Sequence, residues 1–104
     1  MNKTYITIVR GTLKGRNREE NQRLHDEAYE PLKALGTSLG AVGHVAYLNP
    51  DNSNEFLAID TWSSLEGARK LFADPSLGEA FSRLFVGMPD ISFWGESGWA
   101  AFGK

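Results

Sequence analysis

The residues best suited to proton transfer are the two histidines, and the first of them has an aromatic partner. His25 and Tyr29 are four positions apart in a predicted helix, so their side chains are neighbours. His25 borders the apolar stripe of that helix. Facing a cleft between helix and sheet, it could move protons near neutral pH. The alternative is a boundary histidine beside a half-exposed tyrosine, without a chemical role.

The second histidine lies in a predicted strand. His44 shares its strand face with the apolar residues Val42, Ala46 and Leu48. It could act as a base or a ligand, or be a hydrogen-bonded core residue. Asp60 lies on an apolar face of the next strand and needs a partner there, because an unpaired buried charge is costly. Whether His44 reaches Asp60 depends on the hairpin register, since a slip of one residue reverses the faces.

Trp62 ends the strand that carries Asp60. Its indole could line a pocket for a flat apolar molecule and offer one N–H donor, or it could simply pack at a strand–helix corner. Asp60 and Phe72 are the further candidates for substrate contact. The chain has no phosphate-binding loop, HExxH, Gly-x-Ser-x-Gly or EF-hand motif. It also has no cysteine. We therefore expect no metal and no cofactor.

These residues must be positioned by short strands and helices. Apolar and β-branched runs predict strands at 4–10, 42–48, 55–62 and 90–94. A helix should begin after Asn17, kink or end its first segment at Pro31, and close at Gly36 and Gly40. A capping box of Ser63 and Glu66 opens the next helix, and Asp74–Pro75 opens another.

The order of these elements is β-α-β-β-α-(α)-β. With right-handed crossovers this order predicts a ferredoxin-like α+β fold. Its sheet would have four antiparallel strands with the helices on one face. At 104 residues, without a linker or an internal repeat, we expect one domain spanning 1–104.

The strands are apolar on both faces, which predicts a homodimer. Ile6 and Ile8 point one way in the first strand, whereas Tyr5 and Val9 point the other way. The helices can cover one face only, and the other would be a larger apolar patch than monomers usually expose. A second sheet from a twin subunit would cover it. The alternative is that the tail, with its aromatic residues, and the loops cover it.

Charge and composition limit the other partners. Net charge is −2, from 11 basic and 13 acidic residues. The small basic cluster of Lys14, Arg16 and Arg18 cannot track a phosphate backbone, so we expect no nucleic acid partner. No apolar run approaches the roughly 20 residues of a membrane helix, and the N-terminus lacks signal-peptide features. We therefore expect a cytoplasmic protein without membrane contact.

One segment carries a family resemblance. The run Leu57-Ala-Ile-Asp-Thr-Trp62-Ser-Ser-Leu-Glu-Gly-Ala68 is similar to the acidic-x-Trp strand end and capped helix of antibiotic-biosynthesis-monooxygenase-like proteins. These proteins belong to the dimeric α+β-barrel superfamily. The resemblance covers nearly the whole chain as topology, and it implies a homodimer with a pocket between each sheet and its helices. Some members oxidise polycyclic aromatic compounds without metal or flavin, whereas others degrade haem.

The chain departs from this family at one position. Members often carry a histidine about nine residues after the tryptophan, where this chain has Leu71. The haem-degrading activity therefore loses its axial ligand unless His25 or His44 substitutes. The resemblance favours cofactor-independent oxidation of a small aromatic or polyketide-like substrate. Trp62 would orient that substrate, while His25, Tyr29 or His44 would assist proton removal.

Two alternatives to an enzyme remain open. One is a non-catalytic dimer that binds a small hydrophobic ligand in the same pocket. The other is a structural or stress-associated dimer without a ligand. A pocket that contains a histidine would favour the enzyme, and a purely apolar pocket would favour ligand binding. A space packed shut by Phe72, Phe81 and Phe85 would favour the structural protein.

Overall fold

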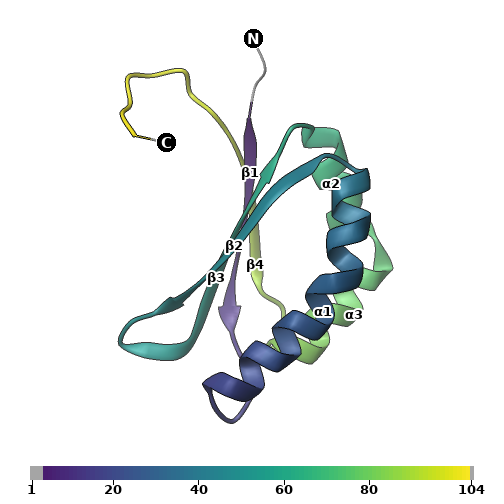
Figure 1. Ribbon diagram of the computed structural model, residues 1–104, viewed down its shortest axis with the longest axis vertical. Coiled ribbons are helices and arrows are strands. Elements are labelled where there is room, and N and C mark those ends of the chain that lie inside the picture. Colours follow the sequence, from purple (N-terminus) through teal and green to yellow (C-terminus); the bar gives the residue numbers. More distant parts are fainter. Residues whose placement is uncertain (1–3, 104) are drawn as a thin grey trace.

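A four-stranded antiparallel sheet with three helices on one face makes up residues 4–103, which the computed structural model describes (Figure 1). In chain order the elements are β1 (Tyr5–Thr12), α1 (Arg18–Ser38), β2 (Ala41–Asn49), β3 (Asn52–Trp62), α2 (Leu65–Ala73), α3 (Pro75–Leu84) and β4 (Asp90–Gly95). The strands pair in the order β2-β3-β1-β4. The predicted ferredoxin-like α+β fold is confirmed, with strand ends that differ by up to three residues.

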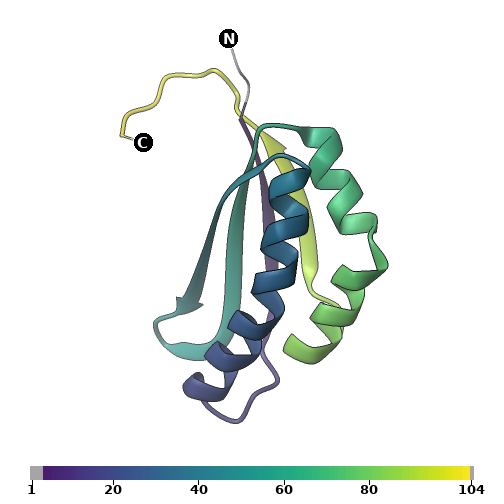
Figure 2. The ribbon, with the colours of Figure 1, turned by 45° about the vertical axis from the view of Figure 1, so that its right-hand side comes forward.

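The register of the sheet decides which side chains face the helices. Val9 in β1 lies opposite Ala58 in β3 on one side and Ile91 in β4 on the other. Because residues alternate between faces along a strand, Thr7 and Phe56 share this inner face. Figure 2 shows α1 beside the pair α2 and α3, together covering the sheet. The space between these two layers holds the core.

The first helix begins as predicted but does not break where expected. The Asn17 side chain accepts a hydrogen bond from the Glu20 backbone N–H at 2.8 Å, which caps the N-terminus. The prediction that Pro31 ends a first segment was wrong, because α1 runs on from Arg18 to Ser38. Gly40 follows with φ of +105°, a conformation that glycine adopts without strain. It turns the chain into β2.

The second and third helices each start at a side-chain cap. Ser64, and not the predicted Ser63, caps α2 by accepting from the Gly67 N–H at 3.0 Å. The capping serine is therefore one residue later than predicted. Asp74 caps α3 ahead of Pro75, as predicted. Hydrogen bonds from the Ser76 hydroxyl and N–H hold the pKa of Asp74 below its usual value.

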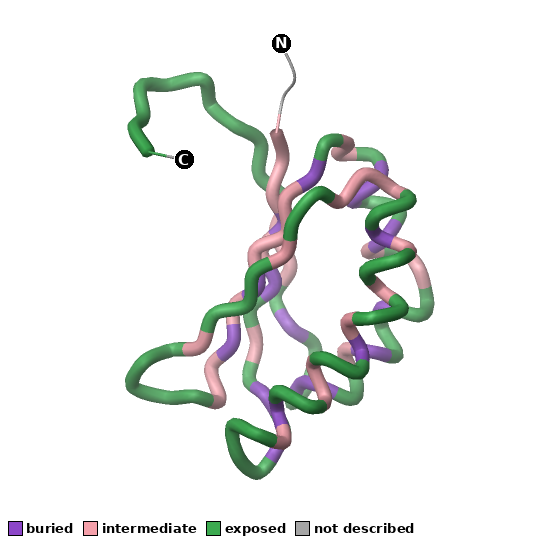
Figure 3. The backbone as a smooth tube through the Cα atoms, viewed as in Figure 1, coloured by how far each residue is buried: buried purple, intermediate pink, exposed green. Residues whose placement is uncertain are grey.

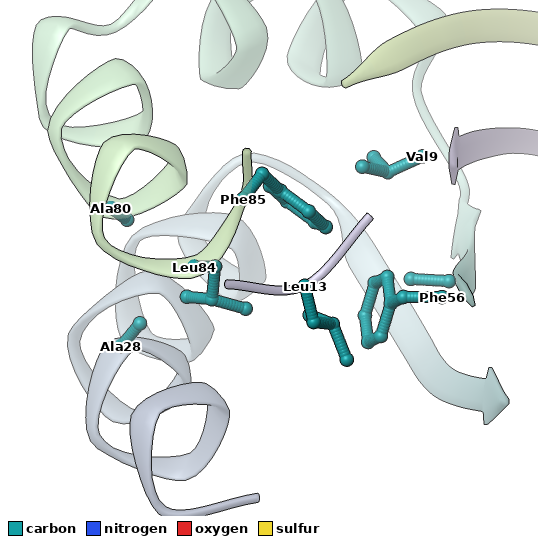
Figure 4. Close-up of a cluster of buried hydrophobic side chains, with 8 residues drawn as sticks. Val9, Leu13, Ala28, Phe56, Ala80, Leu84 and Phe85 are labelled. Carbon is teal, nitrogen blue, oxygen red and sulfur yellow. The ribbon is translucent and has the colours of Figure 1, made fainter. Parts of the chain in front are cut away.

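Two groups of buried apolar side chains join the layers. The larger group is drawn in Figure 4. There Leu84 and Phe85, at the end of α3, lie in one cluster with Leu13 and Phe56. Phe56 and Phe85 pack edge to face, with ring centres 5.5 Å apart. A second group forms around Trp62, which is 1% exposed. Figure 3 shows the buried positions concentrated between sheet and helices.

One glycine fixes how α2 meets the end of α1. A Cβ atom at Gly67 would overlap the backbone carbonyl oxygen of Leu39, the C-cap residue of α1. Backbone cannot move aside like a flexible side chain, so we expect Gly67→Ala to destabilise the protein. Overpacking of this kind costs about 3 kcal/mol. Urea unfolding followed by circular dichroism measures the difference.

Gly78 provides the matched control for this prediction. It also lies within a helix, α3, but a Cβ atom there meets nothing within 4 Å. Gly78→Ala should therefore stabilise the protein by about 0.5–1 kcal/mol, because alanine loses less entropy in a helix. Equal stability of Gly67→Ala and the parent would contradict the close packing of α2 on α1.

The outer face of the sheet carries apolar side chains that no helix covers. Val45, Tyr47 and Trp94 on this face are each more than half exposed. The segment after β4 leads away from the sheet and is exposed throughout its described length (Figure 3). It carries Trp99 and Phe102, which are 83% and 101% exposed. Among the described residues, no helix is long and apolar enough to cross a membrane.

Candidate active site

The β2–β3 hairpin brings a histidine and a carboxylate together. Its register places His44 directly opposite Asp60, so both side chains point to the inner face. The His44 Nδ1 atom lies 2.5 Å from the Asp60 Oδ1 atom. An ionised carboxylate only accepts hydrogen bonds, so we assign the proton to Nδ1. The register that the sequence left open is thus the one that pairs these two groups.

The second histidine meets the first from the helix layer. The Nε2 atoms of His25 and His44 are 3.1 Å apart. The ring planes differ by 19° and the ring centres are 5.2 Å apart. Because the Nε2 atoms are much closer than the ring centres, the rings meet through these nitrogens. On its far side, His25 places Nδ1 2.9 Å from Oδ1 of Asp26, its neighbour in the chain.

Tyr29 packs against both imidazoles. Its ring centre lies 5.8 Å from that of His25 and 4.9 Å from that of His44. The ring planes of Tyr29 and His25 differ by 15°. Tyr29 follows His25 by one helical turn of α1, as the sequence predicted. Its ring therefore restricts the orientation of both histidines from the cavity side.

Asp60 is also linked to the buried tryptophan. The Trp62 indole N–H donates to the Thr7 hydroxyl at 3.0 Å, and this hydroxyl lies 3.5 Å from Oδ2 of Asp60. Thr7 is completely buried. Its hydroxyl thus has a donor on one side and an acceptor on the other, which fixes the direction of the bonds. Since Thr7 uses the indole N–H, Trp62 offers the cavity its ring surface and not the predicted donor.

These side chains line a cavity between sheet and helices. Its volume is about 340 Å³. That lies within the roughly 300–1,000 Å³ of small-molecule sites. Its wall is mainly apolar. The exposed residues Lys33, Thr37 and Val42 lie on its rim. Phe72, Phe81 and Phe85 line the cavity and do not fill it, so the space is not packed shut.

Hydrogen-bond accounting shows what the histidine pair can do. Both Nδ1 atoms carry protons, because each faces a carboxylate. The two Nε2 atoms therefore face each other as acceptors when both rings are neutral. One added proton turns this repulsive contact into an N–H···N hydrogen bond between two carboxylates. The pair is thus built to take up a single proton, and its protonated form is already arranged.

All the candidate residues named from the sequence lie together here. His25, Tyr29, His44, Asp60, Trp62 and Phe72 all line the cavity. Sequence reasoning missed Thr7 and Asp26. Thr7 is a polar residue at an inward position between Tyr5 and Val9, and that signal was available. Asp26 gave none, because adjacent helix residues do not normally face each other.

The remaining features of the site are the metal-ligating and charged side chains around the cavity. Within residues 4–103, no three or more histidine, aspartate or glutamate side chains are grouped to hold a metal ion. The Nζ atom of Lys33 lies 6.0 Å from the ring centre of Tyr29. The Asp60 side chain is 18% exposed, so its carboxylate needs the hydrogen bond from His44.

Comparison with solved structures identifies the fold. The chain aligns with a monooxygenase from the gene ActVA-Orf6 of Streptomyces coelicolor in complex with nanaomycin D, over 98% of this chain and 95% of that one, at 20% identity and a TM-score of 0.71. It aligns with SnoaB, a cofactor-independent oxygenase from Streptomyces nogalater, over 98% and 99%, at 15% identity and a TM-score of 0.66.

A protein of Nitrosomonas europaea assigned to the antibiotic biosynthesis monooxygenases aligns over 94% of both chains, at 13% identity and a TM-score of 0.69. No family model and no curated protein sequence matches the chain. The chain therefore has the α+β fold of antibiotic-biosynthesis-monooxygenase-like proteins. The resemblance that the sequence predicted is confirmed at the level of the fold.

Proposed function

We propose that this chain is a cofactor-independent oxygenase that deprotonates a small aromatic alcohol in the cavity and lets the anion react with dioxygen. The observation that carries this proposal is the His25–His44 pair, held between Asp26 and Asp60 on the wall of an otherwise apolar cavity. An aromatic anion is electron-rich enough to reduce dioxygen. Its formation is the step that protein groups can assist.

The similar structures support this proposal. SnoaB is a cofactor-independent oxygenase, and the ActVA-Orf6 monooxygenase was solved with nanaomycin D bound. This chain aligns with each over nearly its full length. Because fold alone does not determine function, the histidine pair and the cavity carry the argument. The ring surface of Trp62 gives a flat substrate a stacking partner.

The reaction balances with dioxygen as the only co-reactant. The substrate O–H proton passes to Nε2 of the histidine pair, and the anion then transfers one electron to dioxygen. The resulting radical and superoxide combine to form a carbon–oxygen bond. The peroxide takes up a proton from water. Loss of the ring C–H proton with cleavage of the O–O bond gives a quinone and water. The substrate proton stays on the pair, so the pair must pass it to solvent before the next turnover.

Oxygen uptake with simple probes tests the proposal. We expect the purified protein to consume oxygen with α-naphthol or anthrone, whose enol form is an aromatic alcohol, and to release the quinone. A positioned base contributes roughly 10²–10⁴-fold to such a rate. An oxygen electrode measures the dioxygen consumed, and the absorbance of the quinone measures the product formed. Absence of oxygen uptake above the protein-free rate with both probes would overturn the enzyme proposal.

The apolar wall of the cavity also fits a second function, non-catalytic binding of a small hydrophobic ligand. Most of the cavity is lined by aliphatic and aromatic side chains, including Val9, Leu77 and Phe81. Binding of α-naphthol without oxygen uptake, seen as NMR shifts of cavity residues, would favour a non-catalytic ligand-binding protein. If α-naphthol neither binds nor reacts, only the structural dimer remains of the three hypotheses.

We also propose that two copies pair through the outer face of the sheet. This face is formed by alternating residues of all four strands: Ile6, Ile8, Val45, Tyr47, Leu57, Ile59 and Trp94. The three helices lie on the opposite side of the sheet, so no helix of the described chain covers this face (Figure 1). A two-fold related sheet would bury them, and the exposed Trp99 and Phe102 would gain a surface to pack on.

A further inference from the structure

The histidine pair joins two separate hollows of the molecule. The first is the cavity described above. The second is an outer groove of about 570 Å³ between the first turns of α1 and the β2–β3 hairpin. Asp26 and Arg18 line the outer groove, whereas His44 and Asp60 line the cavity. Of the described residues, only His25 and Phe56 line both.

His25 is the one titratable group in the wall that these two hollows share. Its partner in that wall, Phe56, is 6% exposed and packs with its ring centre 5.9 Å from that of His25. An apolar ring carries no proton, so a proton that crosses the wall here must use His25. Its Nε2 atom faces His44, and its Nδ1 atom faces Asp26.

The Asp26 end of this row of groups is its exposed end. The side chains of Asp60, His44 and His25 are 18%, 22% and 21% exposed. The side chain of Asp26 is 62% exposed. The three contacts along the row measure 2.5, 3.1 and 2.9 Å between the hydrogen-bonding atoms. When the pair carries its shared proton, a continuous row of hydrogen bonds therefore runs from the cavity wall to solvent.

We infer that Asp26 and His25 are the proton exit of the site, carrying the substrate proton from His44 through the wall to the outer groove. This inference rests on the proposed function, because it assigns the route by which that base is regenerated. Asp26 acts through His25 and is thus a positioning and proton-accepting residue that does not touch the substrate.

The transfer balances within the row. A proton shared by the two Nε2 atoms moves fully onto His25, which then releases its Nδ1 proton to the Asp26 carboxylate. Asp26 passes that proton to water in the outer groove. His44 keeps its own Nδ1 proton, hydrogen-bonded to Asp60, and its Nε2 atom again carries no proton. His25 is left with its proton on Nε2, and proton exchange with water returns it to the Nδ1 form. The other ionisable groups that line the two hollows are Tyr29 and Lys33 at the cavity, and Arg18 and Tyr47 in the outer groove.

Asp26→Asn tests the exit, because asparagine keeps an acceptor for His25 but cannot take up the proton. With anthrone in dilute buffer, we expect kcat to fall about tenfold with KM unchanged. Imidazole added to the buffer should restore the rate, since a small base can reach His25 from the outer groove. Glu30→Gln, an exposed carboxylate on the same helix, is the matched control and should change nothing. An unchanged kcat in Asp26→Asn would overturn the inference.

A measurement without substrate separates this inference from the proposed function. The Nδ1 protons of His25 and His44 can be followed by NMR on protein with 15N-labelled histidine. We expect Asp26→Asn to slow the exchange of the His25 Nδ1 proton with water about tenfold, with Glu30→Gln unchanged. Equal exchange rates would overturn the exit even if oxygen uptake is confirmed. Slower exchange without oxygen uptake would support the exit and contradict the oxygenase.

Discussion

Replacing His44 by glutamine is expected to lower oxygen uptake with α-naphthol or anthrone at least a hundredfold. His44 is the central group of the row, bonded to Asp60 through Nδ1 and to His25 through Nε2. Removing it eliminates the acceptor on which a substrate proton is placed, and such a base contributes roughly 10²–10⁴-fold. The glutamine amide can still donate to Asp60, so the carboxylate keeps a partner.

Asp60 gives the same prediction a second measurement. Combining His44→Gln with Asp60→Asn should cost little more than the first change, because the two residues act as one unit. Full additivity would show that Asp60 acts independently.

The stability of His44→Gln shows whether its lower rate results from lost chemistry or from unfolding. Unfolding of His44→Gln in urea should match the parent closely, because the side chain is partly exposed and its bond to Asp60 is replaced. Binding of α-naphthol, followed by NMR, should persist as well. An inactive variant that still folds and binds would assign His44 to the chemical step. A variant that retains the parent's rate would remove the pair from the mechanism.

Much of the fold could be predicted because it follows from local patterns. The apolar and β-branched runs of the strands, the Asn17 cap and the Asp74–Pro75 cap all act over a few residues, and the structure confirms them. One error arose where two neighbouring residues compete. Ser63 and Ser64 are both able to cap α2, and their position relative to Leu39 and Gly67 decides for Ser64.

Pro31 shows the limit of propensity in a long helix. Proline removes one backbone donor and crowds the preceding turn, which favours a break. In α1 the residues on both sides pack against the sheet layer, with Ala28 and Leu32 in contact with the core. Packing of the apolar face outweighs one lost hydrogen bond, since most helical stability in proteins comes from such packing. Local signals could not show this balance.

The candidate site depends on distances that the sequence does not contain. The residue types indicated that His25, His44 and Asp60 were capable of proton transfer. Their assembly required the hairpin register that sets His44 opposite Asp60, and the position of α1 that brings His25 to 3.1 Å. Both are tertiary properties with no marker in a single sequence. Asp26 and Thr7 join the row only through that assembly.

Ile59→Lys is expected to convert the proposed homodimer into monomers. Ile59 lies in the central strand β3, with Ile8 and Val45 opposite it on the neighbouring strands of the outer face. In a two-fold interface the substitution would bury two unpaired ammonium groups, and burying each costs several kcal/mol. In a monomer the same lysine reaches water and costs little. Sedimentation equilibrium should therefore give the parent twice the chain mass of 11.5 kDa, and the variant that mass itself.

Ala73→Lys adds the same charge to an exposed position on the helix side of the molecule and should remain dimeric. A monomeric parent would contradict the dimer outright, and the apolar outer face would then need another explanation. A dimeric Ile59→Lys would place the interface elsewhere on the surface. The variant also separates assembly from chemistry, because the histidine pair, Asp26 and Asp60 all come from one chain and lie on the opposite face of the sheet. Monomers that still consume oxygen would show that the row of hydrogen bonds needs no partner subunit.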